Sequence, residues 1–241
     1  MPEGTGFLEV YLREIGAQTP VSLFASEAEQ SAEILTHKHV QKTEIIGVDA
    51  APLSLKTLDE LSQEASTCRL CSLADTRKTV VFGVGNPNAD LVFIGEAPGR
   101  DEDIKGEPFV GRAGQLLGRM LLAIELDRED IYIMNTIKCR PPNNRDPRPD
   151  EVQSCNLWFE QQLNMLQPKM ICLLGRVAAQ TVLETDATLG SLRGRWHEYH
   201  GIPVRVTYHP AYLLRSPQQK YKSWQDLMVL SHRLRAEQSL D

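Results

Sequence analysis

The amino-acid sequence predicts an α/β fold with three layers, in which helices cover both faces of a four-stranded, mostly parallel sheet. Short apolar runs that end at a glycine or a polar residue are typical of buried parallel strands. Segments with helical spacing of apolar residues alternate with these runs, as βα units do. The runs are residues 91–94, 131–134, 170–174 and 204–208, and the helical segments are residues 112–125, 150–166, 176–184 and 219–236.

The chain divides into an N-terminal extension, residues 1–55, and a predicted domain, residues 56–241. The net charge is −6, and residues 1–67 hold eleven acidic but only four basic side chains. The remainder is therefore close to neutral, with local basic clusters such as the one between Lys138 and Arg148. Such clusters permit a polyanionic partner but do not require one.

Composition excludes two classes of protein. No run approaches the roughly 18 apolar residues that a membrane span needs. The first residues, MPEGTGFLEV, lack the basic stretch of a secretory signal. We therefore expect a cytoplasmic, monomeric protein without a membrane partner.

Residues 91–117 contain the longest connection between a strand and a helix. This connection is about three times as long as the usual 2–6 residues. It includes Pro98, Phe109 and several glycines. Long ordered loops at the carboxyl ends of parallel strands commonly bind ligands. We interpret this segment as a binding loop, and the alternative is a plain connection with a solvated acidic tip.

The five cysteines fall into two groups. Cys172 lies in an apolar run and is interpreted as a core residue. Cys68 and Cys71 form a CxxC motif, and Cys139 and Cys155 follow at a distance in polar segments. Disulfides are not expected in a cytoplasmic protein. Metal ligation is favoured over free thiols, with an iron–sulfur cluster and zinc both open.

Two polar residues follow predicted strands at the same edge of the sheet, Asn135 and His209. An asparagine amide can pair with the edge of a base. A histidine can donate to a carbonyl oxygen that gains charge, and Phe109 can stack on a planar ring. Taken singly, Asn135 could cap a turn and His209 could be an ordinary loop histidine, but their shared edge favours a binding site.

The segment after His209 suggests a contact with DNA. Leu213 and Leu214 can form an apolar wedge that enters a duplex, and Arg215 can contact a phosphate. The alternative is that the two leucines begin a helix and belong to the core.

Together, these motifs resemble those of the family-four uracil-DNA glycosylases, the iron–sulfur class found in bacteria and archaea. The resemblance covers about residues 56–236 and includes the spacing of the four cysteines. Its motifs are GEAPG at 95–99 with Glu102, GEPFVG at 106–111, NTIKCRPP at 135–142 and HPAYLLR at 209–215.

The resemblance implies an enzyme that excises uracil from DNA and leaves an abasic site. It also implies a four-stranded parallel sheet and a structural [4Fe-4S] cluster. The implied cluster ligands are Cys68, Cys71, Cys139 and Cys155. The implied uracil-binding residues are Gly95, Glu96, Ala97, Phe109, Asn135 and His209.

Within this resemblance, Phe109 would stack on the flipped base, Asn135 would read its Watson–Crick edge, and His209 would face its O2 atom. Other families of the superfamily have an aspartate, which orients the attacking water, where this chain has Ala97. The predicted catalytic residues are therefore Glu102, His209 and Glu96, with Asn144 as a weaker candidate for the water.

Other functions are compatible with parts of the sequence. A non-catalytic iron–sulfur DNA-binding protein of replication or repair would need the cysteines but not Asn135 and His209. A related class that bonds covalently to abasic sites carries a basic, histidine-containing insertion after the asparagine motif, whereas residues 141–147 are short and lack histidine. An electron carrier is the third alternative.

Overall fold

The computed structural model describes residues 56–239, which form a mixed sheet of six strands covered by helices. The predicted extension, residues 1–55, lies outside the described residues. The strands are β1 (Val84–Gly85), β2 (Leu91–Gly95), β3 (Tyr132–Asn135), β4 (Met170–Leu174), β5 (Trp196–Tyr199) and β6 (Ile202–Thr207).

The sheet has the order β1-β3-β2-β4-β6-β5. The four central strands are parallel, whereas β1 and β5 pair antiparallel at the two edges. The predicted number of four strands is therefore wrong, although the parallel centre is confirmed. The strand β1 has only two residues, and β5 joins β6 through a two-residue turn. Both turn residues, His200 and Gly201, have positive φ values of 50° and 82°, as tight hairpin turns require.

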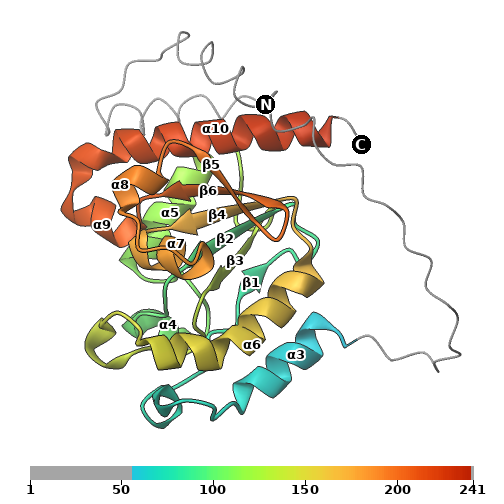
Figure 1. The fold of residues 1–241 in the computed structure, drawn as a ribbon, viewed down its shortest axis with the longest axis vertical. Coiled ribbons are helices and arrows are strands. Elements are labelled where there is room, and N and C mark those ends of the chain that lie inside the picture. The colour runs from blue at the N-terminus through green and yellow to red at the C-terminus, as the bar shows by residue number, and fades with distance from the viewer. Residues whose placement is uncertain (1–55, 240–241) are drawn as a thin grey trace, which may run out of the picture.

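Helices cover both faces of the sheet, so the predicted three layers are confirmed (Figure 1). One face packs against α5 (Arg112–Leu122), α9 (Pro210–Arg215) and α10 (Lys220–Gln238). The other packs against α6 (Pro149–Leu166), α7 (Arg176–Val182) and α8 (Leu189–Leu192). Alternate residues of β2 point to opposite faces: Phe93 lies in the first core, and Val92 and Ile94 lie in the second.

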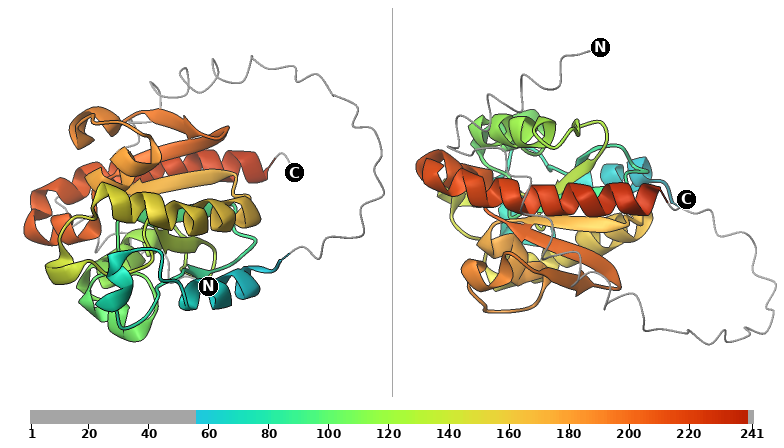
Figure 2. Two further views of the ribbon diagram at one scale, coloured as in Figure 1. Left: turned by 60° about the horizontal axis from the view of Figure 1, so that its bottom comes forward. Right: turned by 90° about the horizontal axis from the view of Figure 1, so that it is seen from above.

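A smaller layer covers the outside of α6. Here α3 (Leu58–Ser66) lies next to α6 (Figure 1, Figure 2). It packs through Leu61 and Ala65, with Trp158 of α6 against the same cluster. Short 3-10 helices complete the described fold: η2 (Ser72–Asp75), η3 (Pro142–Asn144) and η4 (Pro217–Gln219). Within residues 56–239, every helix is too short or too polar to cross a bilayer.

The predicted binding loop after β2 contains one more helix, α4 (Arg100–Lys105). Beyond it the chain turns back at Phe109, whose φ of 54° is unusual for a bulky residue. The guanidinium of Arg128 donates to the carbonyl oxygens of Pro108 (3.0 Å) and Phe109 (3.2 Å). The backbone of this turn lies against Gly114 of α5, where a Cβ atom would come closer than 3.0 Å to the Phe109 carbonyl. The loop is thus held in one conformation.

Two glycines of α5 provide a matched test of this packing. Gly114→Ala should destabilise the protein by about 1–3 kcal/mol, because the added methyl group collides with backbone atoms. Gly118 has no atom within 4 Å of the same added methyl group. Gly118→Ala should therefore stabilise by about 0.5–1 kcal/mol through helix propensity. Urea unfolding of both variants measures the difference, and equal effects would contradict the close approach.

Candidate active site

A cleft of about 410 Å³ opens at the carboxyl ends of the parallel strands. Most of the predicted site residues line it: Glu96, Ala97, Glu102, Phe109, Asn135, Asn144, His209 and Arg215. Other residues that line it were not predicted as site residues from the sequence, among them Arg145, Asp146 and Tyr212. Asp146 and Tyr212 could have been found only from their neighbours in space.

Gly95 lies between two of the predicted binding residues, Asn135 and Phe109. It ends β2 directly beside Asn135, the last residue of β3. A Cβ atom on Gly95 would approach both the Asn135 amide oxygen and the Phe109 ring more closely than 3.0 Å. The missing side chain therefore leaves room for both the amide and the ring at the end of β2.

The amide oxygen of Asn135 is buried and has no hydrogen-bond partner within the described structure. The residue is only 2% exposed, so bulk water does not satisfy this acceptor. An unpaired buried acceptor costs about 1–3 kcal/mol. Such an atom at the wall of a cleft fits a ligand that donates a hydrogen bond to it.

His209 is held as a neutral hydrogen-bond donor. Its Nδ1 atom accepts from the backbone N–H of Ala211 at 3.1 Å, so the proton of the neutral ring lies on Nε2. Burial, and secondly the charge of Arg215, lower the pKa of His209 to about 4. The ring lies 5.6 Å from that of Phe109, centroid to centroid. A ligand against Phe109 would therefore have this ring beside it.

Glu96 titrates near neutral pH. Burial is the main cause that raises its pKa to about 7, and Asp146 adds to the effect while Arg176 opposes it. Asp146 and Arg176 form an ion pair at 2.7 Å. Glu96 is thus a carboxyl group that can change its charge within the working range of most enzymes.

Glu102 and Asn144 are already engaged in hydrogen bonds at the cleft. One carboxylate oxygen of Glu102 accepts from the backbone N–H groups of Val110 and Gly111, each at 3.0 Å. The side-chain oxygen of Asn144 accepts from Arg140 at 2.7 Å. Glu102 therefore fixes the loop that carries Phe109, and its second oxygen remains for other contacts in the described structure.

The predicted DNA contacts divide between the core and the surface. Leu213 is fully buried (0% exposed) between the sheet, α5 and α10, and its contact with DNA stays a prediction. Leu214 is half-buried against the same core. In α9, which begins at Pro210, Leu213 is buried, whereas Tyr212 and Arg215 line the cleft.

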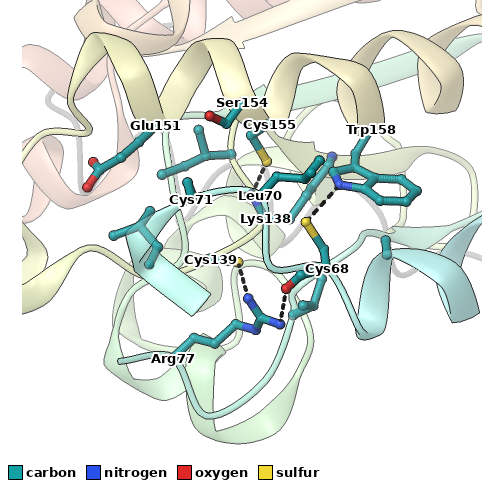
Figure 3. Close-up of a pocket in the computed structure, with 14 residues that line it drawn as sticks. Cys68, Leu70, Cys71, Arg77, Lys138, Cys139, Glu151, Ser154, Cys155 and Trp158 are labelled. Carbon is teal, nitrogen blue, oxygen red and sulfur yellow. Dashed lines mark hydrogen bonds between the residues drawn. The ribbon is translucent and has the colours of Figure 1, made fainter. Parts of the chain in front are cut away.

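The four predicted ligand cysteines line a second cavity together (Figure 3). Three of their sulfur atoms accept hydrogen bonds: Cys68 from Trp158 (3.1 Å), Cys139 from Arg77 (3.5 Å) and Cys155 from the backbone N–H of Lys138 (3.2 Å). Cys172 lies apart from them, buried in β4, as predicted.

Four cysteine thiols that line one cavity are a donor set that can ligate either an iron–sulfur cluster or zinc. Among residues 56–239, no group of three or more Cys, His, Asp or Glu side chains is placed to hold a metal ion. N–H donors to sulfur are typical of cysteine-bound iron–sulfur clusters. Burial, more than any other cause, raises the pKa of Cys139 to about 12, so a thiolate here requires cationic partners.

Lys138 joins the cleft and the cysteine cavity. Its ammonium group is buried (1% exposed) and donates to the backbone oxygen of Asn135 at 3.0 Å and to the side chain of Gln162. The rings of Phe82 and Phe159 lie 5.6 and 6.0 Å from it. The main chain at Lys138 thus contacts Cys155 while its side chain fixes the end of β3.

Comparison with known proteins agrees with this arrangement. The family model of the uracil DNA glycosylase superfamily matches residues 82–228. The type-4 uracil-DNA glycosylase of Archaeoglobus fulgidus is 48% identical over 179 residues, which cover 70% of this chain and 90% of that protein. That of Saccharolobus solfataricus is 42% identical over 68% of this chain and 80% of its own length. That of Thermotoga maritima is 40% identical over 66% of this chain and 84% of its own length. The chain belongs to the uracil DNA glycosylase superfamily.

Proposed function

We propose that this protein is a DNA-repair enzyme of the type-4 class, which hydrolyses the N-glycosidic bond of uracil in DNA and leaves an abasic site. The relatives named above carry the activity in their names. The observation that carries the proposal within this chain is the unpaired, buried amide oxygen of Asn135 in a cleft beside Phe109 and His209.

Recognition of uracil follows from the hydrogen-bonding groups of the cleft. The N3–H group of uracil can donate to the free amide oxygen of Asn135, while the amide NH₂ faces O4. Cytosine has an acceptor at N3 and an amino group at C4, so both pairings would fail. Each unmatched buried group costs about 1–3 kcal/mol. The ring of Phe109 provides a flat surface for the base, which must leave the duplex to enter the cleft.

The chemistry requires charge to be stabilised on both sides of the breaking bond. Uracil leaves as an anion, and the Nε2–H group of His209 can donate to its O2 atom. A fixed neutral donor of this kind acts through electrostatic preorganisation and contributes about 10²–10³ in rate. On the sugar, the carboxylate of Glu96 can stabilise the developing cation and orient the water. The free oxygen of Glu102 is the second candidate for the water.

The second part of the proposal is that Cys68, Cys71, Cys139 and Cys155 hold a [4Fe-4S] cluster with a structural role. The shared cavity and the hydrogen bonds to three of the sulfurs support it. When bound, the cluster would cross-link segments that are distant in sequence. Cytoplasmic location and a monomeric state stay predictions from the sequence.

Replacing Asn135 tests base recognition. Asn135→Asp exchanges the donor of the amide for an acceptor, so uracil excision should fall roughly tenfold to hundredfold. The same variant should gain weak excision of cytosine, since an acceptor can pair with the C4 amino group. The measurement is single-turnover product formation from oligonucleotides that differ only in U or C at one site.

The control variant is Asn143→Asp, which makes the same chemical change at an exposed residue outside the cleft. It should keep the wild-type rates on both oligonucleotides. Wild-type uracil rates in Asn135→Asp would show that Asn135 does not read the base. No excision by the wild-type protein on any uracil substrate would overturn the proposed function itself.

The pH dependence of excision tests Glu96. Because the raised pKa of about 7 makes Glu96 neutral at lower pH, the rate should rise about tenfold per pH unit below 7 and level off above it. His209, with its pKa near 4, does not titrate in this range. Glu96→Gln should be slow and independent of pH. A flat profile for the wild-type protein through neutral pH would contradict the role of the carboxylate.

Metal content tests the cysteine assignment. Protein prepared without oxygen should contain iron and acid-labile sulfide, and Cys139→Ala should lose both together with much of its soluble yield. Cys172→Ala, at a buried position away from the cavity, should retain both. One zinc ion per chain without sulfide would disprove the cluster.

A further inference from the structure

A buried carboxylate fixes the helix that lies inside the binding loop. Asp103 of α4 is only 2% exposed, although α4 belongs to the long connection between β2 and α5. One oxygen of its carboxylate accepts from the backbone N–H of Lys78 at 2.8 Å and from that of Thr79 at 3.4 Å. In return, the hydroxyl of Thr79 donates to the backbone oxygen of Asp103. Two segments that are distant in sequence are thus bonded in both directions.

The segment that binds Asp103 is itself attached to the cysteine cavity. Arg77 precedes Lys78, and its guanidinium donates to the sulfur of Cys139 at 3.5 Å and to the backbone oxygen of Cys68 at 2.5 Å (Figure 3). The backbone N–H groups that Asp103 accepts from therefore belong to a part of the chain that is already held in place.

The residue before Asp103 holds the turn at Phe109. The carboxylate of Glu102 accepts from the backbone N–H groups of Val110 and Gly111, which follow Phe109. The φ of Phe109, 54°, is unfavourable for a bulky residue, so the surrounding contacts must keep it there. Two consecutive carboxylates of α4 thus have separate tasks: Glu102 binds the turn, and Asp103 fixes the helix that carries Glu102.

The burial of Asp103 distinguishes it from a solvated acidic residue. A buried carboxylate is costly unless hydrogen bonds satisfy it, and the backbone of another segment provides them here. Asp101, in the first turn of the same helix, is exposed. Hydrogen bonds to a charged acceptor are about twice as strong as those between neutral groups. Asp103 is therefore suited to hold α4 in one position.

We propose that Asp103 is a positioning residue for uracil binding: it anchors α4 to the backbone at Lys78 and Thr79, and through α4 it keeps the Phe109 ring in place against the base. This inference rests on the proposed uracil excision. Asp103 does not line the cleft, so it acts through Glu102 and Phe109 and not by touching the substrate. Its loss should weaken binding of the base more than it slows cleavage of the bond.

The test measures the inhibition of excision by free uracil together with the maximal single-turnover rate. In Asp103→Ala the acceptor is lost, so the inhibition constant of uracil should rise about tenfold, as expected for a weakened stack between a base and an aromatic ring. The maximal rate should change much less. Asp103→Asn keeps an oxygen that can accept from the same two N–H groups and should restore the wild-type inhibition constant.

A second variant breaks the same connection from the other segment. Thr79→Val removes only the hydroxyl that donates to Asp103 and should raise the inhibition constant by a smaller factor. The matched control is Asp101→Ala, which removes an exposed carboxylate from the same helix outside the cleft. It should leave both the inhibition constant and the maximal rate at their wild-type values.

Three results would overturn the proposal: a wild-type inhibition constant in Asp103→Ala, a loss of maximal rate there without weaker inhibition, or equal impairment of Asp103→Asn and Asp103→Ala. Should Asp103→Ala fail to fold, an unchanged inhibition constant in Thr79→Val would overturn it. A wild-type protein that excises no uracil would instead overturn the proposed function, so the two failures are distinguishable.

Discussion

Both sites depend on the hydrogen bonds that the buried ammonium group of Lys138 donates. A lysine in the interior is costly unless its charge is compensated, and burial lowers its pKa to about 8. The compensation comes from the carbonyl of Asn135, at the end of β3, and from Gln162 on α6. The same helix carries Cys155, which accepts from the backbone of Lys138. The Asn135 amide and the cysteine cavity are therefore parts of one packed unit.

This arrangement links the proposed cluster to a cleft that its cysteines do not line. Asn135 and Cys139 are four positions apart, and the main chain between them turns from the cleft wall into the cavity. Within the cleft, the local environments shift the pKa values of two titratable groups in opposite directions. His209 is held neutral as a donor, whereas Glu96 gains a pKa near 7. Groups whose pKa values are moved apart in this way can have distinct roles in one reaction.

The sequence was most informative where apolar periodicity and motif position agree. The four buried runs became the parallel centre of the sheet, and Asn135 and His209 share its edge because each follows such a run. Strand β5 was missed, since it is half-exposed and has no buried face in its pattern. The two-residue β1 lies at the end of residues 79–85, a segment whose sequence fits either a strand or a turn. For β5, Gly201 was a signal of a tight turn that the sequence itself contains.

The remaining differences arise from contacts between distant residues. Whether Leu213 or Tyr212 faces the cleft depends on the rotation of α9 against α5 and α10, which spacing alone does not determine. The indole of Trp158 reaches Cys68 across 90 positions of sequence, so its role is visible only in the folded chain. Asp146 likewise acts on Glu96 through space.

Recognition of uracil by Asn135 is tested most directly by a crystal structure of the protein grown with free uracil. We predict uracil in the cleft against the Phe109 ring, with N3 within hydrogen-bond distance of the Asn135 amide oxygen and O2 facing Nε2 of His209. Uracil bound elsewhere, or in the cleft with N3 turned away from Asn135, would contradict it.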